Sequence, residues 1–447
     1  MDSLPITPFS QKCKAQISVP GSKSISNRAF ILAAMGNASV KLKGLLVSED
    51  VELMQKALVS LGLKIRYGES SGELLVKGCG GVFPVSKQDI FVGNAGTVAR
   101  FLTALLAMQE NGEYKMDGTD AMRKRPMIEL INSLSLLGCK FEFLGQQGCF
   151  PFIMKTSGVS SVNWKVDATK SSQVLSALMM IAPIIQKKIT IQYSGGTVSE
   201  PFIDLTMQMM KSFSDQKNLE IAGEACEVSI EGCGYNDSDF VYQVEPDATA
   251  ASYFLTLPLV TNGVSNVLGV FKNMQQGDSK YCEILQKVGG QILEHPSGLQ
   301  SSFENNLSGG NFDFNPISDT FLTLAAISPL FKEPLRIYGI KHTRKQETDR
   351  VRGMAEELTK LGQQVNECED SLEISPCIES LKRAAQEKIK IDTYHDHRFA
   401  MSFAILGCHD LFEDGKPWLT INNPMCCAKT FPDFFSHLEQ ARIDSNQ

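Results

Sequence analysis

The sequence predicts an α/β protein of two domains, each built from three repeated units of strands and helices. Three observations lead to this prediction: an apolar helical phrase recurs six times, an amphipathic helical phrase recurs six times between its copies, and strand-like runs fill the intervals. The chain has 447 residues, enough for about two to four domains. Hydrophobic residues make up 43% and charged residues 21%, as is typical of a globular protein.

Each copy of the apolar phrase is a polar turn followed by a stretch rich in Ala, Leu and Ser. The stretch is apolar nearly all round, so we expect a buried helix. Successive copies start 72 to 79 residues apart, which predicts a structural unit of about 75 residues repeated six times. The copies occupy residues 20–36, 93–108, 167–183, 246–260, 318–331 and 395–407.

The second phrase has apolar residues at three-and-four spacing and often ends in Gly, so it predicts amphipathic helices that face solvent. It is clearest at 50–65 and 350–365. The six copies begin near Ser48, Arg125, Glu200, Asp278, Glu347 and Lys429. Strands are expected between the helices, for example at 73–78, 188–193, 334–340 and 388–394.

Six buried helices exceed one ordinary core, so we group the units three and three, in two domains of about 220 residues. No low-complexity linker separates the halves. The boundary near Val244 is therefore inferred from the count of repeats.

Composition excludes several classes of function. Lys and Arg total 43 against 50 Asp and Glu, a net charge of −7, so a nucleic-acid surface driven by bulk charge is not expected. The longest apolar run, at 174–185, is shorter than the roughly 18 residues of a membrane span. Twelve scattered cysteines without a C-x-x-C pair argue against a zinc ribbon or disulfide framework and fit reduced cytosolic thiols. Residues 1–10 resemble neither a secretion nor an import signal.

The polar turns that open the buried helices carry the candidate chemistry. Helix N-termini present unsatisfied N–H groups and partial positive charge, which makes them anion sites. The alternative is ordinary N-capping by Ser beside solvated cations. The recurrence of such donors in different units favours the anion site. The first turn offers Ser22, Lys23, Ser24, Ser26 and Arg28, and the third offers Lys170, Ser171, Ser172 and Gln173.

Seven motifs together resemble the 5-enolpyruvylshikimate-3-phosphate synthase family over essentially the whole chain. They are PGSKSISNR, GNAGTVAR, KRPM, SSQ, ETDR, DHR and AKTFPDF, in this order and spacing. The resemblance implies two domains of three units each, with a chain that begins in one domain, builds the other and returns. Residues 22–244 would form one domain, and residues 1–21 with 245–447 the other, with the active site in the interdomain cleft.

The resemblance also implies the reaction, in which the enolpyruvyl group of phosphoenolpyruvate moves to the 5-hydroxyl of shikimate 3-phosphate and phosphate is released, without a metal or other cofactor. Carried over by motif, the shikimate 3-phosphate side comprises Lys23, Ser24, Arg28, Ser171, Ser172, Ser199, Asp319 and Gln346. The phosphoenolpyruvate side comprises Lys23, Asn94, Gly96, Thr97, Arg100, Arg125, Gln173, Arg350, Arg398 and Lys429.

The expected catalytic residues are Asp319, Glu347 and Lys23. Asp319 would take the proton from the attacking hydroxyl, Glu347 would protonate the methylene carbon, and Lys23 would assist at the substrate oxygens. Taken alone, Glu347 reads more simply as a capping or ion-pairing residue at a helix start. The run at 395–398, HDHR, lacks an acidic or Cys partner at metal-ligand spacing, so we interpret it as a capped helix start.

Four positions depart from the commonest pattern of the family. Gln346 stands where a Lys usually precedes the catalytic Glu, and His342 replaces an Asn four residues earlier. Phe202 replaces a Tyr, and Phe101 replaces a Pro after Arg100. The first three change polar contacts near shikimate 3-phosphate and bear on its affinity more than on the reaction.

Two alternative functions remain open. UDP-N-acetylglucosamine enolpyruvyl transferase shares the six-unit architecture, but Ser24 and the Cys-free segment 119–127 speak against it. A catalytically silent binding paralogue would be expected to lose acid–base residues. We expect a cytoplasmic monomer that binds the two small-molecule substrates, and neither nucleic acid nor membrane, and that is inhibited by glyphosate.

Overall fold

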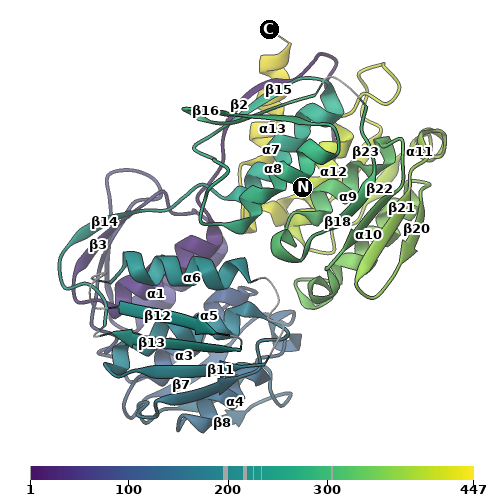
Figure 1. Cartoon of the computed structure of the whole chain (residues 1–447). Helices are drawn as coiled ribbons and strands as arrows, with labels where there is room; N and C mark the ends of the chain where they lie inside the picture. The colour runs from purple at the N-terminus through teal and green to yellow at the C-terminus, as the bar shows by residue number, and fades with distance from the viewer. Residues whose placement is uncertain are drawn as a thin grey trace. The chain divides into compact units, whose positions relative to one another are not determined.

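The computed structural model describes residues 2–194, 200–214, 219–224, 226–232, 234–303 and 306–446. The chain divides into two compact units (Figure 1). We call Gly21–Glu245 the inserted unit, and Met1–Pro20 together with Pro246–Gln447 the split unit. Each unit is described by itself.

The inserted unit contains three four-stranded sheets. Their strands, in spatial order, are β14 (Phe240–Gln243), β3 (Ser39–Lys43), β5 (Leu74–Lys77) and β4 (Lys64–Tyr67) in the first. The second sheet consists of β6 (Lys87–Phe91), β7 (Glu113–Asp117), β9 (Phe152–Lys155) and β8 (Lys140–Phe143). The third sheet consists of β10 (Asn163–Val166), β11 (Ile189–Tyr193), β13 (Glu227–Gly232) and β12 (Leu219–Glu224).

The split unit also contains three sheets. The first sheet consists of β16 (Gln291–His295), β17 (Gly298–Ser302), β15 (Val264–Leu268) and β2 (Lys14–Ser18). The second sheet consists of β18 (Gly310–Asp313), β19 (Leu335–Tyr338), β21 (Ser371–Ser375) and β20 (Gln364–Glu367). The third has three strands, β1 (Ser3–Pro5), β23 (Leu419–Asn422) and β22 (Ile389–Ile391).

All six sheets follow one pairing rule. In each, two strands pair in parallel, and one of them pairs antiparallel with a further strand. In the five four-stranded sheets the fourth strand completes an antiparallel hairpin. This shared topology confirms the predicted sixfold repeat.

Buried helices lie inside each unit, and their N-termini coincide with the predicted polar turns. They are α1 (Lys23–Met35), α3 (Gly96–Ala107) and α5 (Ser172–Ile181) in the inserted unit, and α7 (Ala248–Thr261), α9 (Phe321–Ile327) and α12 (His397–Gly407) in the split unit. Every residue of α3, α7, α9 and α12 is buried, which confirms the expectation drawn from their apolar composition.

The amphipathic helices bury one face only. They are α2 (Glu49–Ser60), α4 (Ile128–Leu136), α6 (Pro201–Ser212), α8 (Tyr281–Lys287), α10 (Arg350–Lys360) and α13 (Phe434–Ser445). A short helix, α11 (Ile378–Ala385), was not predicted. Short 3-10 turns η3 (Gly277–Lys280) and η7 (Pro424–Lys429) precede α8 and α13.

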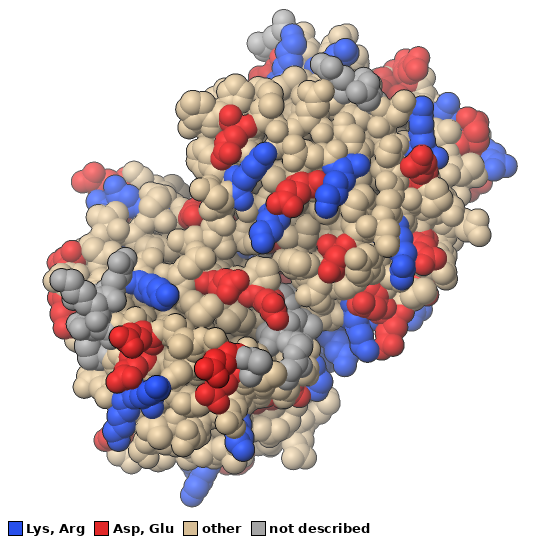
Figure 2. Space-filling model, in the orientation of Figure 1, with Lys and Arg blue, Asp and Glu red and all other residues tan. Residues whose placement is uncertain are grey.

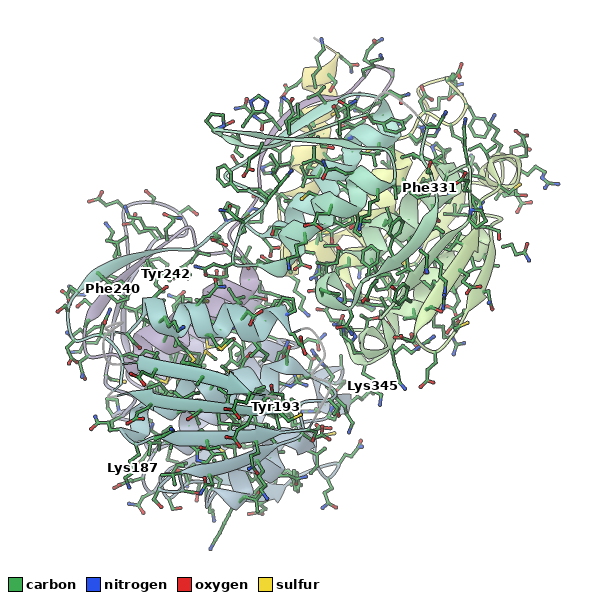
Figure 3. The ribbon with its side chains drawn as sticks, viewed as in Figure 1. Lys187, Tyr193, Phe240, Tyr242, Phe331 and Lys345 are labelled. Atoms are coloured by element: carbon green, nitrogen blue, oxygen red, sulfur yellow. The ribbon has the colours of Figure 1, made fainter. Side chains whose placement is uncertain are left out.

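Each unit has its own hydrophobic core. At one side of the inserted unit's core, Phe240 and Tyr242 lie on β14 (Figure 3), with ring centroids 5.2 Å and 4.6 Å from that of Phe213. Lys and Arg are interspersed with Asp and Glu on the face drawn in Figure 2. None of the helices in the described part of the chain is both long and apolar enough to cross a membrane.

Candidate functional site

The first turns of α1, α3 and α5 gather in the inserted unit. The Asn27 side-chain amide donates to Thr97 Oγ1 at 3.0 Å, which ties α1 to the start of α3. Arg100 Nη1 donates to Gln173 Oε1 at 3.2 Å, which ties α3 to the start of α5. Because helix N-termini concentrate N–H donors, their convergence forms a region suited to anions.

Lys23 opens α1 directly after its N-cap. The N-cap is Ser22, whose hydroxyl accepts from the backbone N–H of Ile25. Lys23 Nζ lies 3.4 Å from Oδ2 of Asp50, a buried carboxylate at the start of α2. Asp50 thereby holds the ammonium near the helix start. The motifs did not single out this acidic partner.

Two further cations lie around the start of α3. Arg100 is 7% exposed and donates to the carbonyls of Gly96 and Pro126, both at 3.2 Å. Arg125 Nη1 donates to the carbonyl of Asn94 at 3.3 Å. A methyl group on Gly96 would lie 2.6 Å from Arg125 Nη2, so both guanidiniums can approach this turn only because the residue is glycine.

The serines expected to hold a phosphate group begin at the third helix. Ser171 is the N-cap of α5 and accepts from the backbone N–H of Gln173 at 3.3 Å, and Ser172 is buried beside it. Lys170 forms an ion pair with Glu129, with 2.6 Å between Nζ and Oε1. Ser24 is half-buried in the first turn of α1. Ser199 lies outside the described residues.

In the split unit, the carboxylate of Asp319 lies between two guanidiniums. Arg350 Nη1 donates to Oδ1 at 3.0 Å, and Arg398 Nη2 donates to Oδ2 at 2.6 Å. Although burial opposes its charge, the carboxylate of Asp319 raises the pKa of Arg398 above its ordinary value. The candidate base is therefore held by the two arginines that the resemblance assigns to phosphoenolpyruvate.

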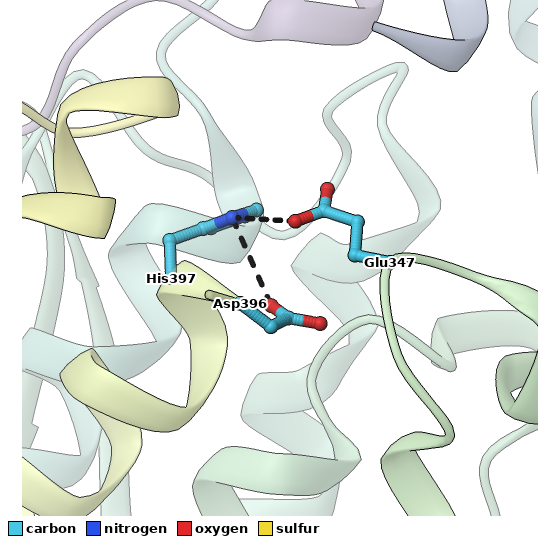
Figure 4. Close-up of side chains that lie close together, drawn as sticks. All are labelled: Glu347, Asp396 and His397. Carbon is cyan, nitrogen blue, oxygen red and sulfur yellow. Dashed lines mark ion pairs between the residues drawn. The ribbon is translucent and has the colours of Figure 1, made fainter. Parts of the chain in front are cut away.

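Glu347 and Lys429 come together from the turns before α10 and α13. Glu347 Oε1 lies 2.9 Å from Lys429 Nζ, and Oε2 lies 3.3 Å from Nδ1 of His397 (Figure 4). Burial lowers the pKa of His397 and so favours the neutral imidazole. The N-cap of α10 is Asp349, which accepts from the backbone N–H of Arg352, so Glu347 does not cap this helix.

Asp396 has two partners behind this group. Its Oδ1 accepts from the backbone N–H of Arg398 at 3.0 Å, which confirms the predicted capped helix start. Its Oδ2 accepts from Arg350 Nε at 2.7 Å. Although burial opposes the charge, Asp396 raises the pKa of Arg350 above its ordinary value. Asp396 thus orients Arg350 toward Asp319.

The run at 395–398 has no acidic partner at metal-ligand spacing along the chain, but the fold brings one to it from a distant segment. Glu347, Asp396 and His397 present ligand-type atoms within 4.8 Å of one another, because the fold brings residue 347 beside residue 397. Among the residues that the structure describes, these three could hold a metal ion. A cation there would also face Lys429 and Arg350, which already pair with the two carboxylates.

The two polar departures in the split unit have protein partners. Gln346 Oε1 accepts from Arg350 Nη1, and His342 Nε2 contacts Ser318 Oγ at 2.8 Å. Lys345, between them, is exposed. Sequence reasoning also missed Asp278, a buried carboxylate that accepts from Gln276 and Thr249, both at 2.9 Å. Burial, with a further contribution from the charge of Asp319, raises the pKa of Asp278 to about 7.

Six sheets of one topology, packed with buried helices in two units, make up an α/β fold of the enolpyruvyl transferase type. Comparison with solved structures supports the fold. An EPSP synthase from Acinetobacter baumannii superposes with a TM-score of 0.79 at 23% identity, covering 99% of this chain and 98% of that one. The enolpyruvyl transferase NikO from Streptomyces tendae superposes with a TM-score of 0.70 at 13% identity, covering 98% and 97%.

Residues 9–438 match the family model described as EPSP synthase (3-phosphoshikimate 1-carboxyvinyltransferase), and the chain belongs to this family. A 3-phosphoshikimate 1-carboxyvinyltransferase from Opitutus terrae is 44% identical over 99% of this chain and 98% of that protein. One from Trichormus variabilis is 37% identical over 98% of both chains. The two alternative functions are not favoured by these relatives.

Proposed function

We propose that this chain transfers the enolpyruvyl group of phosphoenolpyruvate to the 5-hydroxyl of shikimate 3-phosphate and releases phosphate, a step toward chorismate and the aromatic amino acids. One observation carries the proposal beyond family membership. Arg28 and Arg100 are 1% and 7% exposed, and no carboxylate among the described residues pairs with either. Both guanidiniums have only neutral partners among these residues, so an anion that reaches them gains more than it would at a hydrated arginine.

Residues of both units take part in the proposal. Shikimate 3-phosphate is bound by Lys23, Ser24, Arg28, Ser171, Ser172, Ser199, Asp319 and Gln346. Phosphoenolpyruvate is bound by Lys23, Asn94, Gly96, Thr97, Arg100, Arg125, Gln173, Arg350, Arg398 and Lys429. The guanidiniums suit phosphate and carboxylate because their planar N–H groups can donate in pairs.

The proposed chemistry needs a base for the hydroxyl and an acid for the methylene carbon. Asp319 accepts the proton of the 5-hydroxyl as the oxygen attacks phosphoenolpyruvate, and Glu347 gives a proton to the methylene carbon. The tetrahedral product then loses a proton from the same carbon and releases phosphate. Lys429, 2.9 Å from Glu347, stabilises its carboxylate form after the first transfer.

In this proposal the anions of phosphoenolpyruvate replace Asp319 on Arg350 and Arg398. The three groups are already in contact, so substrate binding exchanges one carboxylate for another on the same guanidiniums. Asp319 is then released to accept a proton, which couples binding to activation of the base.

We further propose that the enzyme acts in the cytoplasm as a monomer and that its only partners are the two small substrates. The eleven cysteines that the structure describes are all free thiols, as a reducing compartment allows. Light scattering coupled to size-exclusion chromatography tests the oligomeric state, and a dimer mass would contradict this part.

Phosphate release, measured with each substrate omitted in turn, tests the main proposal. We expect release only when both substrates are present, together with an equal amount of enolpyruvyl product. Asp319→Ala serves as the inactive control. Release without shikimate 3-phosphate, or none with both substrates, would contradict the proposal.

A further inference from the structure

The guanidinium of Arg28 lies over the rings of two aromatic side chains. Its Cζ is 5.1 Å from the ring centroid of Phe101 and 5.8 Å from that of Phe202. Both distances fall within the roughly 6 Å over which a cation is attracted to the face of a ring. Phe101 belongs to α3 and Phe202 to α6, so rings from two helices contact a cation carried by a third, α1.

Hydrogen bonds fix the guanidinium in this position. Nε donates to Thr206 Oγ1 at 2.8 Å, and Nη1 donates to the carbonyl of Ser24 at 3.1 Å. Nη2 donates to Ser176 Oγ at 3.3 Å and to the carbonyl of Phe202 at 3.4 Å. A guanidinium has five N–H donors. Four are engaged by these described acceptors, which leaves one on Nη1, the nitrogen next to Ser24.

Burial also has an electrostatic consequence. Desolvation lowers the pKa of Arg28 to about 9, which leaves the group protonated at neutral pH. Its charge is compensated by ring faces and neutral oxygens alone, as far as the described residues show. An anion that meets this dry cation therefore gains more than it would at a hydrated arginine.

We propose that Phe101 and Phe202 form an aromatic clamp that positions Arg28 and thereby sets the affinity for shikimate 3-phosphate. The clamp acts through Arg28, so the two phenylalanines are positioning residues rather than catalytic ones. The ring faces exclude water and hold the plane of the guanidinium, and the one remaining Nη1–H is directed to the anionic substrate. This inference rests on the proposed function, because it names a determinant of one substrate's affinity.

The test compares Phe101→Leu and Phe202→Leu with Phe202→Tyr, which keeps the ring. Each leucine variant should raise both KM and the calorimetric Kd for shikimate 3-phosphate by about three- to tenfold. The kcat and the KM for phosphoenolpyruvate should stay within about twofold. Phe202→Tyr keeps the ring and adds the hydroxyl that is common in the family, so it should not weaken the binding of shikimate 3-phosphate. Phe152→Leu, at a buried ring of β9 in the same unit, controls for general loosening of the core.

A double-mutant cycle identifies the route of the effect. In an Arg28→Gln background the leucine substitutions should no longer weaken binding, because the cation that they position is gone. Unchanged affinity in both leucine variants, or equal losses in the Arg28→Gln background, would overturn the clamp. A parent protein that binds shikimate 3-phosphate yet releases no phosphate would contradict the proposed function instead, since calorimetry reads binding without turnover.

Discussion

Lys429 Nζ lies 2.9 Å from Oε1 of Glu347, although the two residues stand far apart in the sequence. The ammonium stabilises the ionised carboxyl, while the buried imidazole of His397 contacts the other oxygen at 3.3 Å. Glu347 is thus held between a cation and a group that is neutral at ordinary pH. This arrangement suits a carboxyl that must both give and regain a proton.

Glu347→Gln keeps the shape of the side chain and removes the titrating group. If Glu347 transfers the proton, kcat should fall by about two to four orders of magnitude, with little change in the binding of either substrate. Steady-state kinetics and calorimetry measure the two quantities separately. Near-normal turnover would leave Glu347 as an ion-pairing residue only.

Asp319→Asn removes the charge shared by Arg350 and Arg398. We expect kcat to fall by about three orders of magnitude because the base is lost. The affinity for phosphoenolpyruvate, measured in the presence of shikimate 3-phosphate, should stay the same or improve, because the guanidiniums no longer pair with a competing carboxylate. Weakened binding of phosphoenolpyruvate would contradict the exchange of carboxylates. Full turnover would contradict the role of Asp319 as the base.

Gly96→Ala places a methyl group 2.6 Å from Arg125 Nη2 and 3.0 Å from Arg100 Nη1. The displaced guanidiniums should raise the KM for phosphoenolpyruvate by about tenfold. The inhibition constant of glyphosate should rise further, because this inhibitor is longer. Gly223→Ala is the matched control, since a methyl group there meets no atom of the described structure within 4 Å. Equal rises in both variants would point to general destabilisation.

We expect glyphosate to inhibit the parent in competition with phosphoenolpyruvate. It carries a phosphonate and a carboxylate, so the same guanidiniums can bind it. Phe101 lies in α3, which runs from Gly96 to Ala107, and its ring contacts the guanidinium of Arg28 from α1. The inhibition constant of glyphosate, measured at several phosphoenolpyruvate concentrations, shows whether the two compete. The same measurement on Phe101→Pro shows whether the ring affects the binding of glyphosate. Tolerance to millimolar glyphosate in the parent would contradict the expectation.

The raised pKa of Asp278 predicts that the stability of the fold depends on pH. The unfolded chain ionises Asp near pH 4, whereas burial raises the pKa of Asp278 to about 7 in the fold. Between these values the folded state binds more protons than the unfolded state, so the free energy of unfolding falls as pH rises. Asp278→Asn should flatten this slope and add about 1–3 kcal/mol at pH 8.

Urea unfolding at pH 5 and pH 8 measures the slope for the parent and for Asp278→Asn. The amide oxygen of Asn can still accept from Gln276 and Thr249, so the packing is retained. Asp89→Asn, at an exposed position, is the control and should change neither value. A variant that loses stability at pH 8 would show that the ionised carboxylate is needed.

The sequence predicted the six units and the starts of the buried helices because both depend on local patterns. The phrase at 318–331 extends beyond α9, which ends at Ile327 and is followed by the 3-10 turn η5 (Ser328–Leu330). The site was predictable only as separate segments. Pairs such as Glu347 with His397 depend on how distant units pack, and no spacing in the chain encodes them.

Phe101 and Phe202 show the same limit. Each was recognisable in the sequence as an unusual residue in its own motif. Their relation to each other became visible only when both rings were found within 6 Å of the guanidinium carbon of Arg28. The contact is three-dimensional, so neither motif alone could have predicted an aromatic clamp.

The chain enters and leaves the inserted unit side by side. Ser22 N–H donates to the carbonyl of Glu245 at 2.9 Å, and Asp247 N–H donates to the carbonyl of Pro20 at 2.8 Å. During synthesis the inserted unit therefore has all its strands once β14 has been made, whereas β2 must wait for β15 before it can pair. β2 is thus made before the inserted unit but pairs only after it, and residues 21–245 form an insertion with adjoining ends.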